Sequence, residues 1–444
     1  MGIEDFKNGT GQRLYARAKQ ILPGGAQLLG KRAEMYLPDL WPSYYARASG
    51  CEVWDLDGHR FLDFTMVGIG AQTLGYADPD VEKAVIDAVK SAPMCTLNPP
   101  EDVALAELLL DLHPWADMVS YARTGGEVMA KAVRIARAAT GRDEIAFCGY
   151  HGWHDWYISV NLGSGADGLQ GHLLPGLEPN GVPRGLAGTT HPFAYGNLDA
   201  LRTIVEQRGN KLAAIVMEPV RGAGRIPGFL EGAREIATKN GSVLLFDEIT
   251  SGFRMNTGGA HLAYGIEPDL ATYAKALSNG FAMAAIVGRK SVMEAVQKTF
   301  ISSAYFTERV GPAAALATTA KHRRIDAGKT LTEIGTRVQE GWKKIAERTG
   351  VPISVTGIPA LASFGFQDGE APAYMTLFIQ EMLGRGFLAS DRFYPTVRHE
   401  EQHVRAYLEA VEAAFGKVAD ARKKGDVRSR LLGPVKHTGF ARLA

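Results

Sequence analysis

The sequence LLFDEITSGFR (244–254), followed by PDLATYAKALSNG (268–280), decides how this chain is interpreted. An apolar run ends in Asp247, and a second apolar run ends in Lys275. Short apolar runs that end in a charge are typical of buried parallel strands, whose carboxyl ends form the ligand site of an open α/β sheet. The two charges are twenty-eight positions apart, close to the ~30 residues of a strand, a crossover and a returning strand. We therefore expect Asp247 and Lys275 to face one pocket from neighbouring strands.

An aspartate and a lysine in apolar surroundings have a specific chemical use. Burial lowers the pKa of a lysine, so part of it is neutral and can attack a carbonyl to form a Schiff base. A buried aspartate needs a cationic partner, and a protonated pyridine nitrogen provides one. This combination is what pyridoxal 5'-phosphate (PLP) requires of a protein. Spacing alone leaves open the alternative that Asp247 and Lys275 are unrelated charges at strand ends.

Composition excludes several classes of protein. The chain has 444 residues, enough for one large and one smaller domain that each bury a core. Its net charge is +1, which provides no general attraction to nucleic acid or membranes. The cysteines Cys51, Cys95 and Cys148 form no metal or disulfide pattern. The N-terminal segment lacks an apolar signal core and no apolar run reaches ~18 residues. We expect a cytoplasmic globular protein with no nucleic-acid or membrane partner.

A candidate phosphate site precedes the helical pattern that ends at Gly141. Thr124, Gly125 and Gly126 stand at the expected N-terminus of this helix. Backbone N–H groups there point outward at the positive end of the helix dipole, which favours a phosphate. The alternative is an ordinary N-cap in which the glycines serve only the turn.

Two further strand ends carry polar or aromatic side chains. Tyr150 and His151 follow the run EIAFC, where Tyr150 could stack on a flat ring and His151 could contact it. His151 and His154 form an alternative pair of metal ligands, but no further ligand is nearby in the sequence. Glu218 ends the run KLAAIVM. The stretch 160–190 is rich in glycine and proline, which indicates either a functional lid or disorder.

Three short motifs imitate other kinds of site. GAQLLGKR (25–32) approaches a nucleotide-binding P-loop, but Arg32 replaces the expected Ser or Thr and no strand precedes it, so we predict a turn. GIGAQT (68–73) is a dinucleotide fingerprint that lacks its last glycine. HEEQH (399–403) matches the zinc-peptidase pattern H-E-x-x-H, but we expect its first histidine to lie before the helix begins, which disfavours a zinc site.

Taken together, the motifs LPGG, VWDLDGHRFLDF, TGGE, GYHGWHD, MEPV, FDEITSGFR and PDLATYAKALSNG resemble the class III aminotransferases, a family of fold-type I PLP enzymes. The likeness covers nearly the whole chain and is strongest to the glutamate-1-semialdehyde aminomutase branch. It implies an α/β fold with a mostly parallel central sheet in a large domain, plus a smaller α+β domain built from both chain ends. We place the large domain at 79–318, between an N-terminal segment at 1–78 and a C-terminal domain at 319–444.

The resemblance also implies a role for each motif. Lys275 would form the Schiff base and act as general base, Asp247 would hold the pyridine nitrogen, and Tyr150 would stack on the ring. The family is expected to form homodimers with shared sites. The remaining cofactor contacts would come from Thr124, Gly125, Gly126, His151, Glu218 and, from the neighbouring subunit, Thr307.

Departures from the aminomutase pattern favour a different reaction. Val67 and Gly68 stand where that branch has a Ser-Trp pair, and the segment before the last helix is shorter and lacks a Phe-Glu-Ala run. We therefore predict two-substrate ping-pong transamination from an amino-acid donor, with glutamate the expected one. The acceptor would be an aldehyde or ketone. The aminomutase reaction, a non-catalytic PLP-fold module and a zinc peptidase are the alternatives.

The acceptor prediction rests on the residues that follow Thr307. Glu308 and Arg309 replace the small residues of the family, which favours a larger, more polar acceptor. Arg309 and Arg398 are candidate carboxylate clamps, because a guanidinium grips a carboxylate with two hydrogen bonds. The segment before Arg398 is similar to aminotransferases of bacterial surface-sugar (lipopolysaccharide) biosynthesis, including those that make 8-amino-octulosonate. A sugar acid of the octulosonate type is thus the predicted acceptor.

Overall fold

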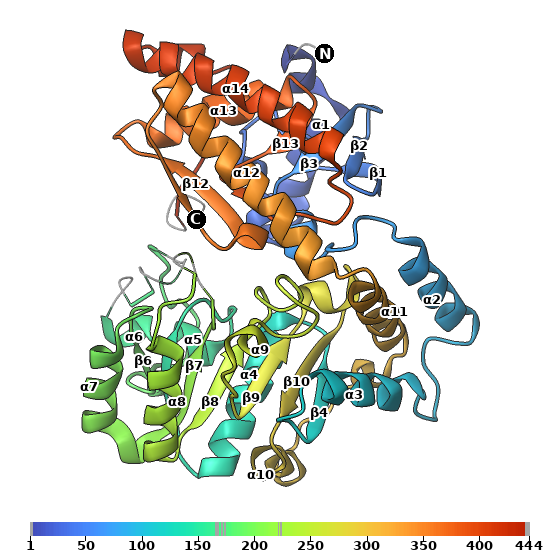
Figure 1. Cartoon of the computed structure of the whole chain (residues 1–444), viewed down its shortest axis with the longest axis vertical. Helices are drawn as coiled ribbons and strands as arrows, with labels where there is room; N and C mark the ends of the chain where they lie inside the picture. Colours follow the sequence, from blue (N-terminus) through green and yellow to red (C-terminus); the bar gives the residue numbers. More distant parts are fainter. Residues whose placement is uncertain are drawn as a thin grey trace. The chain divides into compact units, whose positions relative to one another are not determined.

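The computed structural model describes residues 3–164, 168–169, 172, 175–220, 222 and 224–439. The chain divides into two compact units (Figure 1). The larger unit is residues 79–328, and the smaller is built from residues 1–78 and 329–438. The division into 1–78, 79–318 and 319–444 as folding domains stays a prediction.

A seven-stranded sheet forms the centre of the larger unit, in the order β4-β10-β9-β8-β7-β5-β6. Strand β10 runs antiparallel to both neighbours, and all the other pairs described from β9 to β6 are parallel. The strands are β4 (Met118–Ala122), β5 (Glu144–Cys148), β6 (Thr190–Pro192), β7 (Leu212–Met217), β8 (Val243–Asp247), β9 (Leu270–Tyr273) and β10 (Ala284–Gly288). This arrangement confirms the predicted α/β fold with a mostly parallel central sheet.

The central strands are apolar along their whole length because helices cover both faces of the sheet. Every residue of β7, β8 and β9 is buried. The helices of this unit are α2 (Pro79–Lys90), α3 (Glu101–Leu112), α4 (Gly125–Thr140), α5 (Asp155–Ile158), α6 (Asn161–Ser164), α7 (Leu198–Arg208), α8 (Phe229–Asn240), α9 (Ala260–Tyr264), α10 (Lys290–Met293) and α11 (Val310–Arg324). Part of the stretch 160–190, for which a lid was considered, lies outside the described residues.

The smaller unit has two sheets. Strands β1 (Tyr45–Ser49), β2 (Glu52–Asp55), β3 (Arg60–Phe64) and β13 (Phe387–Ala389) form one, and β11 (Ile353–Thr356), β12 (Ala362–Phe366) and β14 (Arg392–Phe393) the other. Strands β2 and β3 form an antiparallel hairpin whose turn contains Asp57 and Gly58. Its helices are α1 (Thr10–Ile21), α12 (Ala327–Thr349, whose first two residues belong to the larger unit), α13 (Ala371–Leu383) and α14 (Glu401–Lys424).

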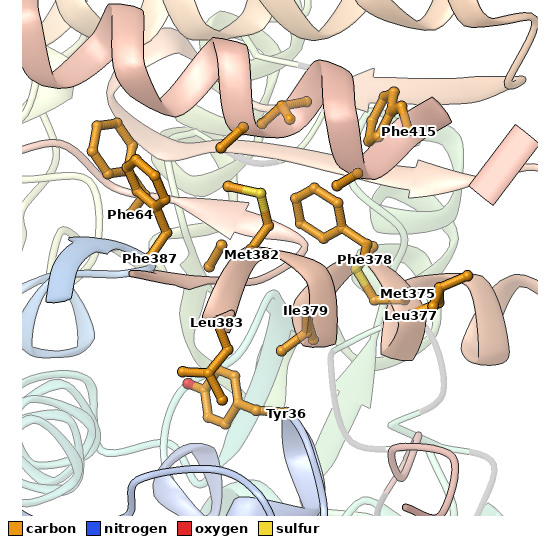
Figure 2. Close-up of a cluster of buried hydrophobic side chains, with 14 of the residues drawn as sticks. Tyr36, Phe64, Met375, Leu377, Phe378, Ile379, Met382, Leu383, Phe387 and Phe415 are labelled. Carbon is orange, nitrogen blue, oxygen red and sulfur yellow. The ribbon is translucent and has the colours of Figure 1, made fainter. Parts of the chain in front are cut away.

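The core of this smaller unit joins both ends of the chain. Phe64 of β3 stacks on Tyr407 of α14 at 4.1 Å between ring centroids. Figure 2 shows Phe378, Phe387 and Phe415 in the same cluster. Because residues more than three hundred positions apart share this core, the N-terminal segment cannot form the unit alone.

Two motif predictions are settled by local structure. Residues 25–32 contain short 3-10 turns, as expected, and no strand leads into them. His399 lies before α14, and both of its ring nitrogens have hydrogen-bond partners. Nε2 lies 2.8 Å from Asp63 O, and Nδ1 accepts the Thr396 N–H at 3.1 Å. Burial lowers the pKa of His399 to about 4. HEEQH is therefore a helix start and not a zinc site.

Candidate active site

Asp247 ends strand β8, and Lys275 lies two residues beyond the end of the adjacent parallel strand β9. Strands β8 and β9 pair in parallel, with Asp247 opposite Thr272, and Lys275 follows three residues later. The Lys275 backbone has φ of +46°, a left-handed conformation that costs a non-glycine residue roughly 1–2 kcal/mol. Strain of this kind is typical of functional positions held by the surrounding fold.

Asp247 is a buried carboxylate with two defined partners. Its side chain is 5% exposed. Oδ2 lies 2.8 Å from His151 Nδ1, and Oδ1 accepts the Ile249 N–H at 3.0 Å. His151 is fully buried, and its Nε2 lies 3.2 Å from Cys148 O. We expect His151 to contact a cofactor ring, and that contact stays a prediction; in the structure both of its ring nitrogens lie at hydrogen-bond distance from Asp247 and Cys148 O. The same contacts exclude His151 as a metal ligand.

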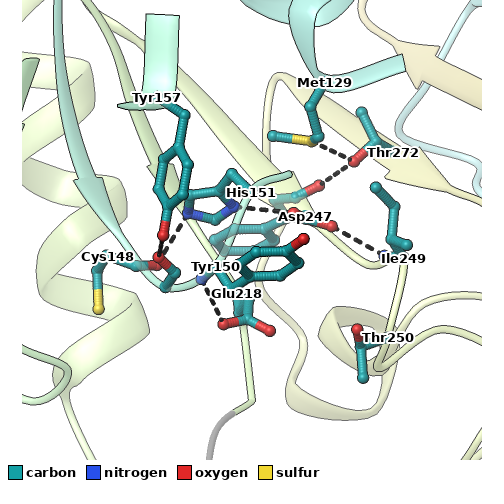
Figure 3. A network of polar contacts seen from close by, with 12 residues as sticks. Met129, Cys148, Tyr150, His151, Tyr157, Glu218, Asp247, Ile249, Thr250 and Thr272 are labelled. Atoms are coloured by element: carbon teal, nitrogen blue, oxygen red, sulfur yellow. Dashed lines mark hydrogen bonds and ion pairs between the residues drawn. The ribbon is translucent and has the colours of Figure 1, made fainter. Parts of the chain in front are cut away.

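Tyr150 and Glu218 lie next to this pair, as Figure 3 shows. The Tyr150 N–H donates to Glu218 Oε2 at 3.1 Å, so the strand-end acid of β7 holds the loop that follows β5. Burial, together with the charges of Asp247 and Glu218, raises the pKa of the Tyr150 hydroxyl. Tyr150 is therefore a neutral aromatic ring at neutral pH, as a stacking residue must be.

The N-terminus of α4 provides a place for a phosphate. Thr124 caps the helix: its hydroxyl accepts the Glu127 N–H at 3.4 Å and its carbonyl accepts the Val128 N–H at 3.0 Å. Within the described part of the chain, the N–H groups of Gly125 and Gly126 make no hydrogen bond. Two amides at the positive end of a sixteen-residue helix thus remain for an anion. Thr124 is therefore an N-cap, and the phosphate site at Gly125 and Gly126 stays a prediction.

Glycine is required at this end of α4 by close packing. A Cβ atom at Gly126 would lie 2.9 Å from His154 Cδ2, and a Cβ at Gly152 would lie 3.0 Å from Gly126 Cα. The loop after β5 therefore touches the helix N-terminus, which brings Tyr150 and the free amides to one site.

The segment around Thr307 is held by cations of its own chain. Arg123 donates to Phe306 O at 3.3 Å and Glu308 O at 2.6 Å. Lys131 Nζ lies 4.6 Å from the centre of the Phe306 ring. The Thr307 hydroxyl donates to Ala304 O at 2.9 Å.

Two of the three predicted substrate residues have structural partners. The Glu308 carboxylate accepts the N–H groups of Val310 at 2.5 Å and Gly311 at 3.2 Å, so it caps α11. Arg309 pairs with Glu101 at 2.6 Å and donates to Ser91 O at 3.3 Å. These contacts give Glu308 and Arg309 roles within the fold, and the expectation that they line the substrate site stays a prediction. Arg398 is exposed in the smaller unit, and its role stays a prediction.

Thr250 was missed by the sequence reasoning. Lys275 Nζ donates to Thr250 Oγ1 at 2.8 Å. A threonine three residues after an acidic strand end carries no signal of its own, because its partner is twenty-five positions away.

Comparisons with known proteins agree with this geometry. The family model described as aminotransferase class-III matches residues 38–415. A 3-aminobutyryl-CoA aminotransferase of Cloacimonas acidaminovorans is 31% identical, covering 94% of this chain and 99% of the relative. A glutamate-1-semialdehyde 2,1-aminomutase of Anaeromyxobacter dehalogenans is also 31% identical, covering 93% and 99%.

Solved structures share the whole fold. An omega-transaminase from Sphaerobacter thermophilus superposes with a TM-score of 0.83 at 26% identity, covering 95% of this chain and all of the other. The FumI protein of Sphingopyxis sp. MTA144, solved with PLP, superposes with a TM-score of 0.83 at 23% identity, covering 94% and 98%. No helix within the described residues is both long and apolar enough to cross a membrane.

Proposed function

The chain belongs to the class III aminotransferases, which are PLP enzymes, and we propose that it transfers an amino group between two separate substrates by ping-pong chemistry. The donor is an amino acid, with glutamate the expected one, and the acceptor is an aldehyde or ketone. PLP supplies a carbonyl for the amine and a ring that takes up electrons.

The residues of this chain fit that cofactor. Lys275 would be the amine that bonds the cofactor and, once released, would move the proton from one carbon to the other. Asp247 would be the acid that keeps the pyridine nitrogen protonated. Tyr150 would cover the ring, and the N–H groups of Gly125 and Gly126 would hold the phosphate. The observation that carries this proposal is that Asp247, at the end of β8, and Lys275, two residues beyond the end of β9, follow adjacent parallel strands.

Borohydride reduction tests the assignment of Lys275. Reduction of the cofactor-loaded protein makes the lysine–cofactor bond permanent, and peptide mapping then identifies the lysine. We expect the mass of the reduced cofactor on Lys275, and no label in a Lys275→Ala variant. Lys131, which is buried in the same unit, is the internal control. Label on another lysine would refute the proposal.

Two classes of compound are candidates for the acceptor substrate. A polyhydroxylated sugar acid of the octulosonate type follows from the sequence departures. Its support is now weaker, since Glu308 and Arg309 have other partners. The 31% identity to a 3-aminobutyryl-CoA aminotransferase favours a second candidate, a thioester with the carbonyl on its third carbon.

A single set of incubations separates these reactions from the aminomutase alternative. Enzyme loaded with glutamate is offered an octulosonate-type keto acid or aldehyde, a 3-oxoacyl thioester, or no acceptor, and amine product is measured. Glutamate-1-semialdehyde is tested without any donor. We expect one of the acceptors to give amine product, with one glutamate consumed for each amine formed. Efficient formation of 5-aminolevulinate without a donor would establish the aminomutase reaction instead.

We propose further that two copies of the chain associate and share their sites. Arg309 N–H donates to Pro93 O at 2.9 Å, so the segments around residues 93 and 309 lie side by side. Exposed apolar side chains gather on these segments, and a second copy would cover them: Met94 (40% exposed), Leu97 (76%), Phe300 (86%) and Tyr305 (66%). Thr307 lies two residues before Arg309, so a second copy covering these segments would bring Thr307 close to the site of the other subunit, where its contact to the phosphate is predicted.

Complementation tests the shared site. Lys275→Ala and Thr307→Ala chains, each inactive or weak alone, are mixed and refolded together. In a mixed dimer one site contains both mutations and the other contains neither, so activity should return to about half of that expected per dimer. Full activity from a demonstrated monomer would contradict the proposal.

A further inference from the structure

The Lys275 amine forms a hydrogen bond with a hydroxyl in the loop that follows β8, the strand next to β9. Nζ donates to Thr250 Oγ1 at 2.8 Å, and both side chains are half-buried. Thr250 lies in the turn that follows β8, three residues beyond Asp247. Figure 3 shows it facing the same region as Asp247 and Tyr150.

The turn that carries Thr250 is fixed at both ends. Before it, the Ile249 N–H donates to Asp247 Oδ1 at 3.0 Å. After it, the fully buried Arg254 donates through Nε to Thr250 O at 3.1 Å. The hydroxyl is therefore held in place relative to Asp247, whereas a lysine side chain carries ~2 kcal/mol of rotamer entropy. A fixed hydroxyl can select one lysine conformation among many.

We propose that the Thr250 hydroxyl is the resting partner of the Lys275 amine. It holds Nζ on the reacting side whenever the amine is not bonded to the cofactor. Thr250 is then a positioning residue that acts through Lys275. This inference rests on the proposed function, in which Lys275 is the lysine that bonds PLP.

A hydroxyl suits a group that must change its protonation state. With the cofactor bound, the neutral Nζ would take a proton from the substrate carbon, and the cofactor would accept the electron pair of the broken C–H bond. The ammonium then returns that proton to the other carbon. A hydroxyl can donate to the neutral amine and accept from the ammonium, so it supports both states and keeps its own proton. A carboxylate in its place would favour the ammonium and oppose the first step.

Two variants separate the hydroxyl from the shape of the side chain. Thr250→Val keeps the shape and removes the hydroxyl, and Thr250→Ser keeps the hydroxyl. Since a positioned general base contributes ~100-fold or more, we expect kcat of Thr250→Val to fall about 10-fold, with KM for the donor within about 3-fold. Its deuterium isotope effect for the donor C–H bond should rise, because proton transfer becomes slower than the other steps. Thr250→Ser should stay within about 2-fold of the native enzyme.

A second measurement does not depend on turnover. The protein without cofactor is labelled with a trace of acetic anhydride, and the rate at Lys275 is compared with that at the exposed Lys290 by mass spectrometry. Release of Nζ from the hydroxyl should raise the relative labelling of Lys275 several-fold in Thr250→Val and not in Thr250→Ser. Thr250→Ala should behave like Thr250→Val, which provides the test if the valine variant does not fold.

The outcomes are distinct. Unchanged isotope effect and unchanged labelling in Thr250→Val, or an equal loss in Thr250→Ser, would overturn the inference. If reduction places the cofactor on another lysine, the proposed function fails, although the labelling comparison still measures the Thr250–Lys275 contact.

Discussion

Two consecutive acidic residues at the end of strand β8, Asp247 and Glu248, each pair with a buried histidine. Asp247 Oδ2 lies 2.8 Å from His151 Nδ1, and Glu248 Oε1 lies 2.8 Å from His261 Nδ1. Successive side chains of a strand point to opposite faces, so neighbours in the sequence enter different surroundings. The two pairs have the same chemistry and lie in different surroundings.

The difference lies in what completes each pair. Glu248 is fully enclosed: Ser251 donates to its second oxygen, and Trp115 donates to His261 Nε2 at 3.0 Å. Burial alone would raise the pKa of Glu248, but the hydrogen bonds and charge of His261, with Ser251, outweigh it and lower that pKa. All the polar groups of this pair are satisfied by protein.

Asp247 instead lies beside Tyr150, on a strand whose neighbour leads to Lys275. A buried acid–histidine pair is therefore structural or functional according to what lies in front of the carboxylate. The following predictions separate the two pairs, in order of the free energy involved.

Asp247→Asn should lower kcat/KM by about 1,000-fold, roughly 4 kcal/mol of transition-state stabilisation. An amide cannot keep the pyridine nitrogen protonated, although it can still accept from Ile249. Steady-state kinetics at saturating PLP measure the loss. Retention of more than a tenth of the activity would show that Asp247 does not have this role.

Glu248→Gln should destabilise the fold by ~3 kcal/mol, because removing one charge from a buried pair leaves the other groups poorly matched. The kcat per folded molecule should stay within about 3-fold of native, since this pair faces away from the site. Urea denaturation followed by fluorescence, with kinetics on the folded fraction, checks both parts. A large loss of kcat at unchanged stability would reverse the two assignments.

Acid should lower the free energy of unfolding through His113, a buried neighbour of the Glu248–His261 pair. His113 stacks on His261 at 5.7 Å, and burial lowers the pKa of His113 from 6.5 to about 4. The unfolded chain takes up this proton first as pH falls. The stability contributed by neutral His113 is therefore complete above pH 6.5 and is lost progressively toward pH 4, by ~2 kcal/mol at pH 5. In His113→Gln, the fall in unfolding free energy from pH 7.5 to pH 5 should be smaller by that amount. An unchanged pH slope would contradict this.

His151→Asn should lower kcat by about 10-fold, ~1.4 kcal/mol, because the amide can still donate to Asp247 but holds it less firmly. His261→Asn is the matched control: it should lower stability and leave kcat nearly unchanged. Equal effects of the two variants on kcat would remove the distinction between the pairs.

The sequence alone determined the elements that carry the site. Apolar runs before Asp247 and Lys275 predicted β8 and β9, and Thr124, Gly125 and Gly141 predicted both ends of α4. These predictions succeed because strand burial and helix capping depend on residues close together in the chain. The ordered motifs also identified the family, which the family model confirms.

Only the tertiary structure decided which side chains meet. Arg309, predicted to grip a substrate carboxylate, pairs with Glu101, two hundred and eight positions away. His151 pairs with Asp247, and the Thr250 hydroxyl accepts a hydrogen bond from Lys275. The residue types in these pairs are common along the chain, so spacing does not identify the partners; the packing of strand ends and loops does. The sequence therefore determined the position of the candidate site in the fold, and tertiary packing determined which polar groups remain available to act in it.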